Sequence, residues 1–179
     1  MTPELRALVE HAAARRAMLI GLVDAIPADG WSRQAPGDEW NARRHLDHVA
    51  TVDGLLQPFV TEAARGAGTV WLGGAAPGAL ERLRLAAADE AGELAIPEVL
   101  ARMRHERAGM TRAIADLPPS ALECAVCVHD ANGEARSWPL RQYLGYWAEH
   151  DTEHESAIRA AIRTSPDLAA VMLARRRSG

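Results

Sequence analysis

Apolar residues recur every three or four positions along four long stretches of the chain, which is the period of an amphipathic α-helix. These stretches run through residues 3–26, 40–64, 96–117 and 137–163. A shorter helical pattern lies at about 79–90. The chain is therefore predicted to be all-α, as a four-helix bundle with a long crossover between its second and third long helices.

Residues that start or break helices mark the ends of these stretches. Thr2 and Pro3 suit the cap and first turn of the first helix. Ser137 and Pro139 suit the same positions of the last one. Pro58 lies inside the second stretch, where we expect a kink because proline lacks the N–H of the helical hydrogen bond.

Two of the connections have a composition of their own. Residues 65–79 are rich in glycine and form the long crossover. Residues 123–137 hold Asn132-Gly133 between short apolar or mixed runs, a pair typical of hairpin turns. We expect a small two-stranded ribbon or an extended loop there, directly before the last long helix.

Each long helix carries polar side chains on the stripe that should be buried. Burying any of these groups alone is costly, so they must form pairs, bind water or coordinate a metal. Four interruptions that face one interior indicate a polar pocket in the bundle, which is a usual place for metal sites. The residues are Arg16 in the first helix, His45 and His48 in the second, Glu106 and Arg107 in the third, and His150, Asp151 and His154 in the fourth.

His150 and His154 are four positions apart, which lets two imidazoles on one helix face reach the same metal ion. The alternative is a pair of histidines at the core edge with ordinary hydrogen bonds. A third ligand could come from His45 or His48, and periodicity alone does not choose between them. Asp151 is a candidate partner for an imidazole N–H, or a fourth ligand.

The other polar candidates have structural alternatives. Arg16 and Arg107 could pair with Glu106 or Asp151 inside the bundle, or one of them could bind a substrate carboxylate. We favour the structural pairing. A further set of histidines, glutamates and cysteines is expected to lie outside the site. The three histidines should lie at the surface, the two glutamates should face solvent, and the two cysteines should lie on opposite faces of a strand. They are His11, His105, His129, Glu149, Glu153, Cys124 and Cys127.

Composition narrows the class of protein. The 179 residues favour a single domain, with its bundle core at about 3–163 and a short C-terminal helix at 166–176. A net charge of −4 gives no electrostatic case for nucleic-acid binding. The charged, amphipathic start does not resemble a secretory signal, and no apolar run is long enough to span a membrane. We expect a cytoplasmic protein without a membrane partner.

Two segments resemble the motifs of a known superfamily. W-N-A-R-R-H-L-D-H-V-A at 40–50 resembles the Trp-x7-His signature of the DinB/YfiT-like superfamily, and H-D-T-E-H-E-S-A-I at 150–158 resembles its H-x3-H-x3-I motif. The resemblance implies the four-helix bundle and makes His48 the third ligand beside His150 and His154. It also implies zinc or nickel as the metal. Relatives include proteins similar to thiol-dependent S-transferases and to maleylpyruvate isomerase.

Two classes of function follow. Three imidazoles and a water would form an open site, at which a metal lowers the pKa of bound water or of a low-molecular-weight thiol. The protein would then be an enzyme that attacks a small electrophile in S-transfer, isomerisation or hydrolysis. The alternative is a non-catalytic binding or stress-response module with a structural or vestigial metal site. A homodimer is expected, because relatives often pair and the amphipathic tail needs a surface.

Overall fold

The computed structural model describes residues 1–129 and 132–163. The expected C-terminal helix at 166–176 lies outside the described residues. The described chain is mostly helical, as predicted for an all-α protein. Its α-helices are α1 (Pro3–Val23), α2 (Ala42–Ala64), α3 (Ala79–Gly92), α4 (Ile96–Ala115) and α5 (Leu140–Arg163).

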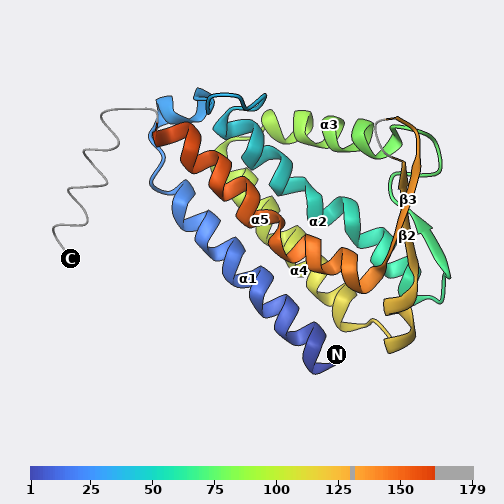
Figure 1. The fold of residues 1–179 in the computed structure, drawn as a ribbon. Coiled ribbons are helices and arrows are strands. Elements are labelled where there is room, and N and C mark those ends of the chain that lie inside the picture. The colour runs from blue at the N-terminus through green and yellow to red at the C-terminus, as the bar shows by residue number, and fades with distance from the viewer. Residues whose placement is uncertain (130–131, 164–179) are drawn as a thin grey trace.

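The four long helices lie side by side, and α3 lies along one side of α2 (Figure 1). Helix α2 packs against α3, α4 and α5, while α1 packs mainly against α5. Local signals fix the helix starts: the Thr2 side chain accepts from the Leu5 N–H at 3.3 Å, and the Asn41 side chain accepts from the Arg44 N–H at 2.8 Å. Helix α2 continues past Pro58 to Ala64. None of the described helices is long and apolar enough to cross a membrane.

A small sheet closes the end of the molecule from which α5 starts (Figure 1). Strands β2 (Ala125–His129) and β3 (Ala135–Pro139) form the antiparallel ribbon that the sequence predicted. The glycine-rich connection after α2 supplies a strand that was not predicted, β1 (Thr69–Trp71), which pairs in parallel with β2 through Val70 and Val126.

The prediction that Ser137 caps the last helix is wrong. Ser137 pairs with Cys127 inside the ribbon, and α5 begins only at Leu140. The Leu140 N–H donates to the Cys124 carbonyl at 2.9 Å. The strand therefore runs straight into the helix, and the backbone of the residue before β2 provides a partner for the first N–H of α5.

Two apolar clusters fill the interior. The sheet-side cluster includes Leu5, Leu56, Val126, Ile114 and Leu144, and the far cluster includes Leu19, Leu46, Met103 and Ile158. Close to the point along each long helix where one cluster gives way to the other lie buried polar residues, among them Arg16, His48, Asp53, Arg107 and Asp151. The fold thus places a polar layer between the two apolar clusters, where several helices can contribute to one site.

Candidate metal centre

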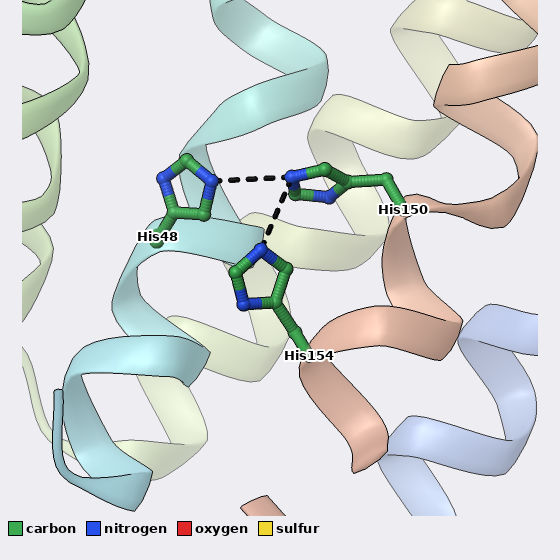
Figure 2. Close-up of side chains that lie close together, drawn as sticks. All are labelled: His48, His150 and His154. Atoms are coloured by element: carbon green, nitrogen blue, oxygen red, sulfur yellow. Dashed lines mark hydrogen bonds between the residues drawn. The ribbon is translucent and has the colours of Figure 1, made fainter. Parts of the chain in front are cut away.

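Three histidines from two helices meet in this polar layer (Figure 2). His48 comes from α2, and His150 and His154 come from successive turns of α5. The Nε2 atom of His150 lies 3.1 Å from that of His48 and 3.2 Å from that of His154. One ring nitrogen of each residue lies within 4.8 Å of the others, a grouping that could hold a metal ion.

Two of the three nitrogen–nitrogen distances in the triad match those around a tetrahedral ion. Zinc–imidazole bonds of about 2.0–2.1 Å place two nitrogens of a tetrahedral site about 3.3 Å apart. The two Nε2–Nε2 distances of 3.1 and 3.2 Å are close to this value. The donor set, three imidazoles, suits zinc, nickel, copper and iron alike.

Burial keeps the three imidazoles neutral. Desolvation lowers the pKa of His48 to about 2 and that of His150 to about 4, and it lowers the pKa of His154 below its ordinary range. The positive charge of Arg84 lowers the pKa of His48 further. A neutral imidazole keeps the lone pair that metal binding requires, so no proton has to leave before an ion binds near neutral pH.

A hydrogen-bonded chain sets the orientation of His154. Asp38 accepts from the Trp40 N–H at 3.0 Å and contacts His45 Nε2 at 3.0 Å, and His45 Nδ1 lies 2.9 Å from His154 Nδ1. The Trp40 N–H, and then His45, lower the pKa of Asp38, so its carboxylate only accepts. His45 therefore donates to Asp38 through Nε2. A proton on Nδ1 of His154, shared with Nδ1 of His45, leaves the Nε2 lone pair of His154 for the shared point.

His48 and His150 lack such support in the described part of the chain. Their Nδ1 atoms are buried and have no hydrogen-bond partner there. Trp40 packs against two rings of the triad, those of His48 and His154. It stacks on His154 with ring centres 6.2 Å apart, and its ring centre lies 5.2 Å from that of His48.

Asp151, predicted to support an imidazole or a metal, pairs with arginines. Its carboxylate accepts from Arg16 at 2.7 and 3.0 Å and from Arg107 at 3.1 Å. Asp53 accepts from Arg107 at 2.7 Å, from Arg16 at 3.2 Å and from Trp147 Nε1 at 2.6 Å. Two buried cations thus face two buried carboxylates. This is the structural pairing that was favoured for the arginines, with Asp53 as a member that was not predicted.

The remaining candidates lie apart from the triad. Glu106 accepts from Arg102 Nε at 2.8 Å and from the Gly54 N–H at 3.0 Å. His11 contacts Glu149 at 2.6 Å across α1 and α5, and His105 is exposed. His129 stacks on Trp71, and both cysteines are free thiols.

Space is available on both sides of the triad. A cavity of about 300 Å³ is lined by His150 together with Arg84, Tyr143 and Trp147. A wider groove of about 870 Å³ is lined by Asp38, Trp40, His45 and His154. Arg84 and Tyr143 were not predicted, because neither breaks a helical stripe in a way that marks it.

The sequence model described as the DinB superfamily matches residues 11–158, which include both histidine motifs, the whole of α2 and α5 as far as Ile158. No curated protein and no solved structure matches the chain. The match covers most of the chain, and the three histidines of the motifs meet at one point in the structure. The chain belongs to the DinB superfamily.

Proposed function

We propose that the protein is a metal-dependent enzyme in which His48, His150 and His154 hold a divalent ion, zinc or nickel. The ion would activate a low-molecular-weight thiol or a water molecule for S-transfer, isomerisation or hydrolysis of a small electrophile. In this proposal α1, α2, α4 and α5 form the four-helix bundle, and residues 65–95 form its crossover.

One observation carries the proposal: three neutral imidazole nitrogens converge beside a cavity of about 300 Å³. A structural zinc site normally uses four protein ligands, whereas a catalytic one keeps a position open. The triad offers three side chains within the described residues, and His150 also lines the cavity. This arrangement favours an enzyme over a purely structural site.

The chain's own residues would bind, orient and exclude water. Trp40 covers the rings of His48 and His154, and the Asp38–His45 pair fixes the proton of His154. The arginine–aspartate cluster secures the turn of α5 next to His150, because Asp151 is bound by both arginines.

A thiol-transfer screen tests the enzymatic proposal. Metal-loaded protein is incubated with bacillithiol, mycothiol or glutathione and a panel of electrophiles, and product formation is measured. We expect turnover with one thiol, and we expect His150→Ala to abolish both turnover and stoichiometric metal. His105→Ala is the matched control, because His105 is an exposed histidine of α4 outside the site. Full metal occupancy in His150→Ala would contradict the triad.

The role of Asp38 can be tested through metal affinity alone. Asp38→Asn replaces the accepting carboxylate by an amide that can also donate, so the proton of His154 is no longer fixed on Nδ1. We expect the metal affinity to fall about 10–100-fold, the usual effect of losing a partner that orients a ligand. The measurement is competition with a chromophoric chelator. Asp29→Asn, in an exposed ion pair with Arg33, should leave the affinity unchanged; equal affinities for the two variants would contradict this role.

A further inference from the structure

An arginine of α3 reaches into the triad from the cavity side. Nη2 of Arg84 lies 3.1 Å from Nε2 of His48, and Arg84 lines the same cavity as His150. Its carboxylate partner in the described chain is Glu81, whose Oε2 lies 3.6 Å from Nη1 and whose side chain is mostly exposed. That pair is long and solvated, so it compensates little of the guanidinium charge.

This position creates a conflict once an ion is bound. Without metal, the His48 Nε2 lone pair can accept a hydrogen bond from Arg84. With metal bound, the His48 Nε2 lone pair binds the ion and can no longer accept from Arg84. The guanidinium then has no acceptor there, and the positive charge of the ion lies next to its own. An anion placed beside both cations would resolve the conflict, and a guanidinium fork suits a carboxylate in particular.

The walls of the cavity indicate the rest of the ligand. Most lining side chains are apolar or aromatic: Val52, Leu55, Leu56, Leu80, Tyr143, Tyr146 and Trp147. A volume of about 300 Å³ suits a small molecule. Burial raises the pKa of Tyr143 to about 12, so its hydroxyl stays protonated and can donate. Glu153 also lines the cavity and is exposed, which disfavours a second negative charge on the ligand.

We propose that this cavity binds a small monocarboxylate with an apolar body, whose carboxylate is held by Arg84 beside the metal. The inference rests on the proposed metal site and deepens it by naming the class of ligand. The apolar body lies against Val52, Leu56 and Trp147, and the carboxylate neutralises the charge that the metal and Arg84 bring together.

Calorimetric titration of the zinc-loaded protein tests the proposal with benzoate and its neutral analogue benzamide. We expect benzoate to bind and benzamide to bind at least about 10-fold more weakly, because hydrogen bonds to charged groups are the stronger ones. Arg84→Gln should weaken benzoate binding about 10–100-fold and leave benzamide binding unchanged. Glu153→Gln should tighten benzoate binding, because it removes a negative charge from the cavity wall.

Arg82→Gln is the matched control, since Arg82 is an exposed arginine of the same helix. It should bind benzoate like the wild type. Metal content is measured on every variant and should stay at one ion per chain. Equal binding of benzoate and benzamide, or unchanged benzoate binding in Arg84→Gln, would overturn this inference and leave the metal site standing. A wild-type protein that holds no metal would overturn both.

Discussion

Asp53→Ala is expected to lower the free energy of unfolding by about 3–5 kcal/mol, the range for removing one partner of a buried ion pair. Asp53 is fully buried and accepts from Arg107, Arg16 and Trp147 Nε1. Without it, two buried guanidinium groups would share the single carboxylate of Asp151. Urea unfolding followed by circular dichroism measures the difference.

Asp89→Ala provides the control for this prediction. Asp89 pairs with Arg44 at 2.6 Å, but its side chain is 71% exposed. Exposed ion pairs contribute about 0–1 kcal/mol, so this variant should unfold nearly like the wild type. If Asp53→Ala were no less stable than Asp89→Ala, the buried cluster would not hold the helices together as described.

His48→Ala and His45→Ala are expected to differ sharply in metal binding, although both remove a buried histidine of α2. His48 directs Nε2 to the shared point of the triad, whereas His45 is bound to Asp38 and His154. We expect His48→Ala to lose more than about 100-fold in metal affinity, and His45→Ala to lose about 10–100-fold, as for a partner that only orients a ligand.

The comparison is made by competition with a chelator on proteins whose circular dichroism spectra match the wild type. His105→Ala, at an exposed position, should retain the wild-type affinity. A larger loss in His45→Ala than in His48→Ala would assign the third ligand to His45 instead.

The helices were predictable because the signals that define them, the apolar period and the capping residues, lie within or next to each helix. The apolar period located the five α-helices of the described residues, and Thr2 marked the first start through a hydrogen bond three residues away. The Asn132-Gly133 pair marked the ribbon in the same way. Strand β1 was missed because only three residues of the glycine-rich connection after α2 form strand pairs, and their partner strand begins 56 residues later, at Ala125. The capping role given to Ser137 failed for the same reason, since the competing partner comes from β2.

The histidines of the site were predictable from the sequence, but the hydrogen bonds that orient them were not. The spacing of His150 and His154 indicated a shared point, and periodicity left His45 and His48 as alternatives because both face the interior. The loop before α2 separates them: Asp38 binds the Nε2 of His45 and turns that ring away from the shared point.

Asp53 lies four residues after the buried Val49, so its place on the buried face of α2 could have been recognised. The roles of Arg84 and Asp38 could not have been recognised from the sequence. Tertiary packing of α3 and of the loop before α2 places these two side chains at the triad. Periodicity within one helix carries no information on such contacts.

The metal content of protein purified without a histidine tag and without added metal tests directly whether the three histidines hold an ion. Elemental analysis by mass spectrometry, with the protein concentration from amino-acid analysis, gives the number of ions per chain. A single site at His48, His150 and His154 predicts a ratio close to one, with zinc or nickel as the metal. A protein that holds no stoichiometric metal, even after incubation with zinc or nickel and desalting, would contradict a metal site at these histidines.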